Sequence, residues 1–265
     1  MDESIQFLVA TTKRDALSEM SQMNIKSKAV FTNQSNSYGV EITDSALMLS
    51  TATIGVGINR NLGLNIAESD YVLLCDDDMY FFAEAEEIIR KYISENPKAD
   101  VVIFNFEYSR DGIKVRDRIT SSRRLRWHNC LHYGICCTLV KLSTLKQKNI
   151  SFTTLFGGGC EYSCGEDSLF FLDCIRKKMR VYQTTHSLGK NEYRESTWFK
   201  GYNEKYFFDK GAWTACAFPK AKHLLKWYFA IKLKSKSQLS FRKIVSLMNK
   251  GIRGFKTLEV YKAAD

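Results

Sequence analysis

The 265-residue sequence lacks long apolar runs, low-complexity linkers and internal repeats. Its apolar runs are interrupted by Lys or Arg well before the roughly 20 residues that a membrane-spanning helix needs. The N-terminal residues lack the basic start and the apolar core of a signal peptide. We therefore expect a globular protein of the cytoplasm.

The eight cysteines do not have the arrangement of a zinc finger. Cys160 and Cys164 form a C-x-x-x-C pair, but there is no second pair and no histidine at finger spacing. Others, such as Cys75 and Cys174, lie in apolar segments. In a cytoplasmic chain of this size we expect these thiols to be reduced.

Acidic residues are almost absent from residues 220–262, which are dense in Lys and Arg. The N-terminal part is mildly acidic, although the whole chain carries a net charge of +10. Such asymmetry favours a polyanionic partner. Nucleic acid and an anionic membrane surface are the two candidates.

The hydrophobic pattern predicts an α/β protein. Strands are expected at 5–10, 29–33, 71–75, 100–108, 132–141 and 180–186. Helices are expected at 14–23, 59–68, 81–96, 165–178 and 203–218. Strands separated by helices indicate a mostly parallel sheet, which binds ligands outside the carboxyl ends of its strands.

Three carboxylates, Asp76, Asp77 and Asp78, follow the apolar run 71–75 directly. Alternate side chains on a strand project to the same side, so Asp76 and Asp78 can share one ligand. Mg²⁺ and Mn²⁺ prefer such oxygen ligands and often bridge them to substrate phosphates. The alternative is a solvated acidic turn that precedes a helix.

A second acidic motif, Gly165-Glu166-Asp167, follows the glycine-rich run "GGGCEYSCG" and opens an amphipathic helix. Such a loop is typical of segments that close over substrates, so these acids suit general-base chemistry. The alternative is that Glu166 or Asp167 only caps the helix.

Four stretches occur in a characteristic order between Ile5 and about Trp213. They are "FLVATT", "GINRNLGLNIAESDYVLLCDDDM", "GED" and "STWFKGYNEKYFFDKGA". Together they resemble the family-2 glycosyltransferases with the GT-A fold, in particular compact bacterial members of capsule, O-antigen and other surface-polysaccharide pathways. The resemblance implies a Rossmann-like, mostly parallel sheet flanked by helices. We expect this domain to span residues 1–218, followed by a basic helical tail over 219–265.

The resemblance also implies site residues. Asp76 would contact the nucleoside, Asp78 would ligate Mn²⁺ or Mg²⁺ on the donor diphosphate, and Asp167 would be the base of an inverting transfer. His186 matches the position of a further metal ligand in many GT-A enzymes, or it is a hydrogen-bonded surface histidine. The other donor-binding residues that we expect are Thr11, Thr12, Asn33, Arg60, Asp77, Lys190 and Arg194.

Departures from the family pattern shape the expected reaction. Many members end their second strand in acids that bind uracil, whereas this chain has Thr32-Asn33-Gln34, and Asn33 can still bond a base edge. The Gln-x-x-Arg-Trp motif of processive members is absent. We expect one sugar to move from a donor, most simply a UDP-sugar, to a glycan acceptor, which we expect to be linked to a polyprenyl diphosphate.

Two other classes compete with this interpretation. A nucleotidyltransferase is expected to carry a glycine-rich phosphate loop after its first strand, and "ATTKRD" has no glycine. A nucleic-acid-binding protein would explain the basic tail, but its aromatic residues match no named module. We therefore expect no nucleic acid partner.

The tail places apolar and basic residues side by side, as in Leu224, Trp227 and Ile231 among Lys222, Lys226 and other lysines. This pattern fits a helix that lies in a membrane interface with its lysines at anionic headgroups. We therefore expect peripheral association with the inner face of a bacterial cell membrane. The alternative is a C-terminal helix that packs on the catalytic domain.

Overall fold

The computed structural model describes residues 3–12, 14–15, 17–192 and 199–261. The chain divides into two compact units. The sheet unit comprises residues 1–153 and 167–194, and the helical unit comprises residues 154–166 and 195–265. By this division the segment 203–218 belongs to the same unit as the tail. The expected division at 218/219 stays a prediction about domains.

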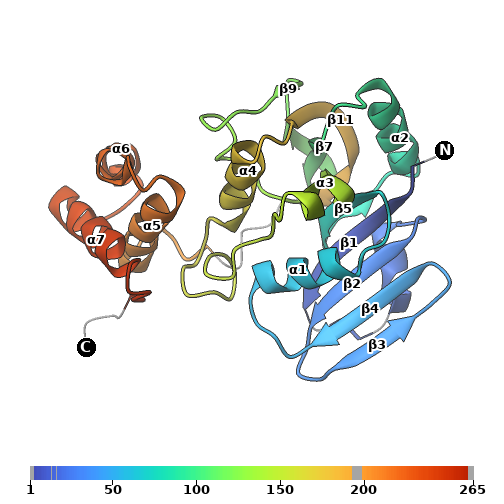
Figure 1. Cartoon of the computed structure of the whole chain (residues 1–265), viewed down its shortest axis with the longest axis horizontal. Coiled ribbons are helices and arrows are strands. Elements are labelled where there is room, and N and C mark those ends of the chain that lie inside the picture. The colour runs from blue at the N-terminus through green and yellow to red at the C-terminus, as the bar shows by residue number, and fades with distance from the viewer. Residues whose placement is uncertain (1–2, 13, 16, 193–198, 262–265) are drawn as a thin grey trace. The chain divides into compact units, whose positions relative to one another are not determined.

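The sheet unit is built on one sheet of 11 strands (Figure 1). The strands are β1 (Ile5–Thr12), β2 (Ala29–Gln34), β3 (Gly39–Ile42), β4 (Ala46–Thr51), β5 (Tyr71–Asp76), β6 (Tyr80–Phe81), β7 (Val101–Arg110), β8 (Ile113–Asp117), β9 (Arg123–Arg124), β10 (Thr138–Lys141) and β11 (Val181–Glu192). Their order is β3-β4-β2-β1-β5-β10-β7-β11-β6, with β8 on β7 and β9 on β11. The expected α/β class is confirmed.

Parallel pairing joins β4, β2, β1 and β5, and also β7 and β11. The short strand β10 lies antiparallel between β5 and β7. The sequence pattern did not predict β3 and β4, which form an antiparallel hairpin beyond β2. A strand was expected over the whole of 132–141, but only its last four residues belong to β10.

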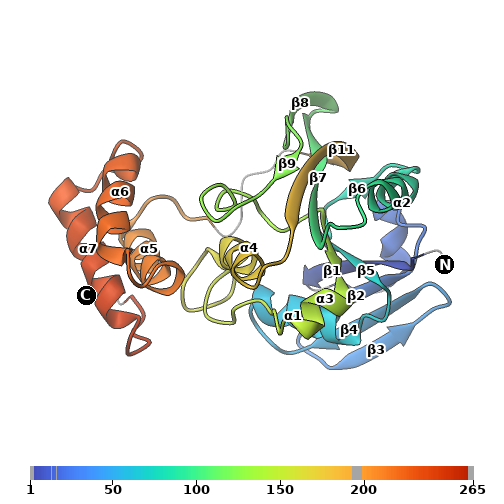
Figure 2. The ribbon, with the colours of Figure 1, turned by 45° about the horizontal axis from the view of Figure 1, so that its top comes forward.

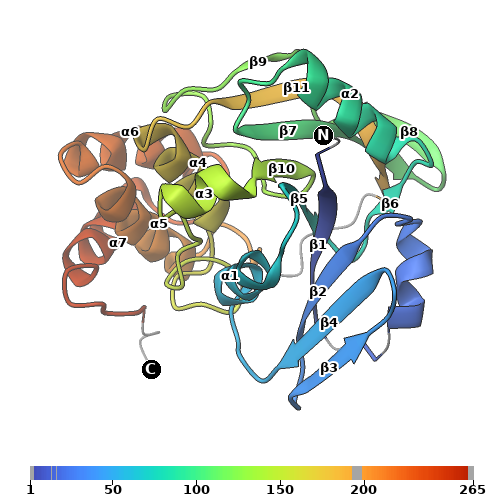
Figure 3. The ribbon, with the colours of Figure 1, turned by 45° about the vertical axis from the view of Figure 1, so that its right-hand side comes forward.

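The helices of the sheet unit are α1 (Val56–Ile66), α2 (Ala85–Glu95), α3 (Leu142–Gln147) and α4 (Glu166–Arg176). Figure 3 shows α2 lying across β7 and β11. The helix expected at 81–96 begins later, at Ala85, because Tyr80 and Phe81 pair with β11 as β6. The helix expected at 14–23 is instead a 3₁₀ helix, η1 (Leu17–Met23).

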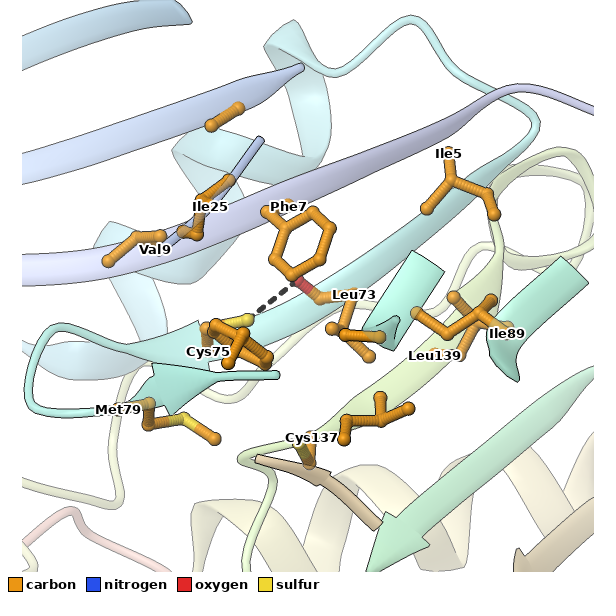
Figure 4. Close-up of a cluster of buried hydrophobic side chains, with 14 of the residues drawn as sticks. Ile5, Phe7, Val9, Ile25, Leu73, Cys75, Met79, Ile89, Cys137 and Leu139 are labelled. Atoms are coloured by element: carbon orange, nitrogen blue, oxygen red, sulfur yellow. Dashed lines mark hydrogen bonds between the residues drawn. The ribbon is translucent and has the colours of Figure 1, made fainter. Parts of the chain in front are cut away.

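One core cluster of the sheet unit lies on the face that packs against α2 and η1. Figure 4 shows Phe7 of β1, Leu73 of β5 and Leu139 of β10 close together, with Ile89 of α2 beside them. Each of these four side chains is at most 2% exposed. Burial of such side chains stabilises the fold by about 1.5–3 kcal/mol each. This packing fixes the strands whose carboxyl ends carry the candidate site.

The helical unit packs α5 (Glu204–Ala217), α6 (Lys222–Lys234) and α7 (Phe241–Gly254) together (Figure 2). Glycines let α5 and α7 meet at backbone distance: a Cβ built on Gly251 would lie 1.9 Å from the carbonyl oxygen of Phe208. Buried Asp209 of α5 accepts hydrogen bonds from the amide and hydroxyl of Ser163, which anchors the segment 154–166 to α5. No described helix is long and apolar enough to cross a membrane.

Candidate active site

The predicted donor-binding residues of the first strands meet at one edge of the sheet. Parallel pairing sets Thr11 of β1 beside Asn33 of β2, and Ala10 beside Asp76 of β5. Asn59 of α1 ties these ends together, because its side-chain amide donates to the carbonyl oxygens of Thr11 (3.3 Å) and Thr32 (2.8 Å). The carboxyl ends of β1, β2 and β5 therefore form one polar edge.

Arg60 of α1 joins the two acidic motifs of the sequence. Its Nη2 lies 3.1 Å from Oδ1 of Asp76, and its Nη1 lies 3.2 Å from Oδ1 of Asp167. The guanidinium is 5% exposed and lies over the ring of Phe152, 5.5 Å from the ring centroid. Because arginine presents several donors in a fixed plane, this one side chain sets the positions of both carboxylates.

Asp76 has a second partner that the sequence did not suggest. The thiol of Cys136 donates to its Oδ2 over 2.7 Å. Burial and the charge of Asp76 raise the pKa of Cys136 well above its ordinary value of 9.0, so the thiol is protonated and serves as the donor. Asp76 is therefore oriented from both sides, although its side chain keeps 40% exposure.

The segment that carries Cys136 also reaches Asp167. Arg118, which follows β8, donates to the carbonyl oxygens of Gly134 and Cys136 and so holds this loop. A Cβ built on Gly134 would lie 3.4 Å from Oδ2 of Asp167. The small residue thus leaves space beside this carboxylate, whose side chain is 26% exposed.

Asp77 points toward β1. The hydroxyl of Thr11 donates to its Oδ2, and Arg14 Nη2 lies 3.5 Å from its backbone carbonyl oxygen. Asn33 holds Arg14 in turn, because it accepts from the Arg14 amide (3.1 Å) and donates to the Arg14 carbonyl (2.7 Å). Asn33 is 1% exposed, so in this structure its amide positions the loop after β1.

Asp78 is the exposed member of the triplet. Desolvation by surrounding protein raises its pKa above the ordinary value of 3.8, and the nearby charges of Asp76 and Asp77 raise it further, while a hydrogen bond from Asn191 lowers it. Such a carboxylate is short of cationic partners.

Lys190 lies close to the triplet. β6 pairs with Gly189–Lys190 of β11, and this pairing brings Lys190 Nζ to 5.6 Å from the ring centroid of Tyr80.

These residues fit a divalent cation that is held mainly by substrate oxygens. Asp76 and Asp77 already have protein partners, which leaves Asp78 as the carboxylate best placed for a cation. Among the described residues, no group of three or more His, Cys, Asp or Glu side chains surrounds a possible ion. One or two carboxylates with a diphosphate is a common arrangement for Mg²⁺.

Three expected residues are not drawn into this cluster by any described contact. Thr12 is exposed at the end of β1. The imidazole of His186 is exposed and lies edge-on to Tyr92 of α2, with 6.1 Å between ring centroids. Arg194 lies outside the described residues. Their roles in binding donor or metal stay predictions.

Comparisons with known proteins concern the family and the fold. Residues 47–153, which include Arg60 and the Asp76–Asp78 triplet, match the family described as Glycosyl transferase family 2. The crystal structure of S. aureus TarS 1–349 in complex with UDP-GlcNAc has a similar fold, with a TM-score of 0.63, 14% identity, and 98% of this chain and 93% of that chain covered.

A second crystal structure of S. aureus TarS 1–349, in complex with UDP, gives a TM-score of 0.59 at 14% identity, with the same shares of each chain covered. At this identity the likeness concerns the fold. A search of curated proteins gives no match.

Proposed function

We propose that the chain is a family-2 glycosyltransferase with the GT-A fold and that it moves one sugar, with inversion, from a nucleotide-diphosphate donor to a hydroxyl group of a glycan. The observation that supports this proposal most is the Arg60 bridge, which sets Asp76 and Asp167 at one site. A donor held near Asp76 would thereby have its anomeric carbon close to a carboxylate. One base suffices for an inverting displacement.

In this proposal Asp167 is the base. It takes the proton of the acceptor hydroxyl as that oxygen attacks the anomeric carbon, and the bond from that carbon to the diphosphate oxygen breaks with its electron pair leaving on the diphosphate. Oδ1 is held by Arg60, and Oδ2 faces the space beside Gly134. We assign that space to the acceptor hydroxyl.

Donor binding is assigned to the polar edge of the sheet. We propose that Asp76 and Asp77 lie beside the nucleoside and that Asp78 holds Mn²⁺ or Mg²⁺ at the donor diphosphate, with Lys190 providing a further positive charge. A divalent ion at that point would offset the charge that develops on the leaving diphosphate. The solved structures of similar fold bind UDP-GlcNAc and UDP, which supports a UDP-sugar, and UDP-GlcNAc first, as the donor.

A panel of nucleotide sugars tests this assignment. Purified protein is incubated with each UDP-, GDP- and dTDP-sugar and Mn²⁺, and release of the nucleoside diphosphate is measured. We expect release from UDP-sugars and much less from the others. Release of pyrophosphate from a nucleoside triphosphate and a sugar phosphate would instead identify a nucleotidyltransferase.

We further propose that α6 docks the enzyme on the anionic inner face of a cell membrane, where it would meet a polyprenyl-diphosphate-linked acceptor. The helix buries Lys226, Ala230 and Leu233 within the helical unit, so part of it packs as protein core. Four large apolar side chains remain exposed at helical spacing: Leu224 (73%), Trp227 (47%), Tyr228 (51%) and Ile231 (67%). Residues 218–258 contain 11 lysines and arginines and no acid.

This combination of an exposed apolar face with many cations favours an anionic bilayer. Each Lys or Arg near such a surface contributes about 1 kcal/mol to binding.

Substitutions on the exposed face of α6 test this proposal better than a truncation does. Removing the tail after Phe218 would expose residues that pack α5 against α7. Leu224→Ser with Ile231→Ser keeps the buried side of α6, and Ile42→Ser with Ile113→Ser removes equally exposed apolar groups from the sheet unit.

We expect the wild type and the Ile42/Ile113 control to sediment with vesicles that contain phosphatidylglycerol, and the Leu224/Ile231 variant to remain in solution. Phosphatidylcholine vesicles should retain little of any protein. Equal sedimentation of all three proteins, or of none, would contradict membrane docking through α6.

A further inference from the structure

A cavity in the sheet unit, away from the acidic site, combines an exposed tryptophan with several cations. Its volume is about 280 Å³. One wall is the segment 124–128, and the other is formed by Ile175 of α4 and by Lys178 and Met179, which follow this helix. None of these residues has a role in the catalytic site proposed above.

The cavity is strongly cationic. Arg124, Arg126 and Lys178 line it and are exposed, and no acid among the described residues forms an ion pair with any of them. The nearby Lys177 and Arg180, by contrast, pair with Asp173 and Asp100. Arginines without an acidic partner are suited to bind phosphate or carboxylate oxygens through two parallel hydrogen bonds.

Trp127 supplies an apolar wall beside these cations. Its side chain is 60% exposed, which is unusual for so large an apolar residue, and the ring of His128 lies edge-on to it with 5.4 Å between centroids. A flat indole face packs well against the C–H face of a sugar ring, because that face is apolar while the hydroxyl groups point outward. The cavity therefore combines the two contacts that an anionic sugar needs.

The cavity wall is held in place by the fold. β9 pairs with β11, and the amide of Leu125, itself 2% exposed, donates to the carbonyl oxygen of Val181 over 2.7 Å. The Asn129 side chain accepts from the Arg126 amide over 2.7 Å and closes the turn after Leu125. The backbone of this wall therefore loses little conformational freedom when a ligand binds, which favours affinity.

We propose that this cavity binds a phosphate-bearing or carboxylate-bearing sugar unit of the acceptor glycan. This inference rests on the proposed function for the identity of the glycan as acceptor. α4 carries Asp167 in its first turn and Ile175 of the cavity near its end, about 12 Å apart at 1.5 Å per residue. An anionic unit bound there would belong to a part of the acceptor a few sugars distant from the reacting hydroxyl.

Fluorine NMR tests the site without any enzymatic turnover. The protein has four tryptophans, so full-length protein labelled with 5-fluorotryptophan gives few signals, and Trp127→Phe identifies that of Trp127. The probes are glucose 6-phosphate, glucuronate, inorganic phosphate and glucose, each at the same concentrations. We expect the Trp127 signal to shift with the two anionic sugars, less with phosphate, and not with glucose.

Two pairs of substitutions distinguish specific binding in this cavity from a general attraction of anions to positive charge. Arg124→Ala with Arg126→Ala should weaken the binding of glucose 6-phosphate by at least about 10-fold. Lys98→Ala with Lys148→Ala removes the same charge from exposed positions elsewhere and should bind as the wild type does. Unchanged folding of both variants is checked by circular dichroism.

An unshifted Trp127 signal, an equal shift in the Arg124/Arg126 variant, or preferential binding of a short single-stranded oligonucleotide would overturn the proposal. Because these readouts need neither donor nor transfer, a failed donor panel would leave them interpretable. If the anionic sugars bind but the nucleotide sugars are not cleaved, the proposed function fails and the site stands.

Discussion

Arg60 and Asp167 lie 107 residues apart in the sequence, yet the guanidinium of one contacts the carboxylate of the other at 3.2 Å. The same guanidinium holds Asp76 at 3.1 Å. The contact between α1 and the start of α4 thus makes one site of two acidic motifs. The two carboxylates have different proposed roles, Asp76 in donor binding and Asp167 as the base, and each role can be tested separately.

Replacing Asp167 by asparagine tests the chemical step. The asparagine amide has nearly the same shape as the carboxylate but does not take the proton of the acceptor hydroxyl. We therefore expect kcat to fall by roughly 10²-fold or more while donor affinity changes little. Calorimetric titration of UDP-GlcNAc and single-turnover kinetics measure the two quantities separately. A loss that is limited to donor affinity would place Asp167 in nucleotide binding.

Arg60→Met should lower kcat/KM by about 10²-fold, because Asp76 and Asp167 both lose the cation that orients them. Arg60→Lys should recover only part of that loss, since an ammonium does not reproduce the planar fork that reaches two carboxylates. The pH profile of kcat/KM should change in shape for Arg60→Met. Equal activity of the lysine and methionine variants would contradict the bridging role.

Gly134→Ala tests the space assigned to the acceptor hydroxyl. The added methyl would lie 3.4 Å from Oδ2 of Asp167, and we expect it to slow transfer by about 10-fold while leaving donor binding unchanged. Gly39→Ala is the control, because a Cβ there has no neighbour within 4 Å. An undiminished transfer rate for Gly134→Ala would move the acceptor elsewhere.

Lys210 links the stability of the helical unit to pH. Burial lowers its pKa from 10.5 to about 8, although Nζ lies 3.8 Å from the ring centroid of Trp213. Between pH 8 and 10.5 the unfolded chain therefore binds more protons at this residue than the folded chain, and the free energy of unfolding should rise with pH, by at most about 1.4 kcal/mol per pH unit.

Urea unfolding of the wild type and of Lys210→Met between pH 7.5 and 9.5 checks this prediction. Methionine keeps an apolar side chain beside Trp213 but does not titrate, so the rise should be smaller in the variant. Equal slopes for the two proteins would mean that Lys210 keeps its ordinary pKa.

The sequence predicted the elements whose patterns are local. Apolar runs and helical spacing predict β1, β2, β5 and α4. The candidate acids, Asp76–Asp78 and Asp167, lie at the ends of two of these segments. β6 was missed because Tyr80 and Phe81 look like the start of α2, and only pairing with β11 makes them a strand.

The contacts within the site were less predictable because they are tertiary. Cys136 lies in a run that reads as a strand, yet the chain there forms a loop that Arg118 holds from a distant position. A positive φ of 59° at Cys137, just before β10, marks the turn, and the residue type gives no sign of it. The hydrogen bond from Asn191 to Asp78 was not predicted, because β11 extends to Glu192, beyond the expected strand 180–186.

The most direct test of the central claim is the release of UDP from UDP-GlcNAc, measured with and without EDTA for the wild type and Asp78→Asn. We expect release by the wild type in Mn²⁺ or Mg²⁺, its loss in EDTA, and little release by Asp78→Asn with either metal. Undiminished release by the wild type in EDTA, or release by Asp78→Asn as fast as by the wild type with either metal, would contradict this role of Asp78.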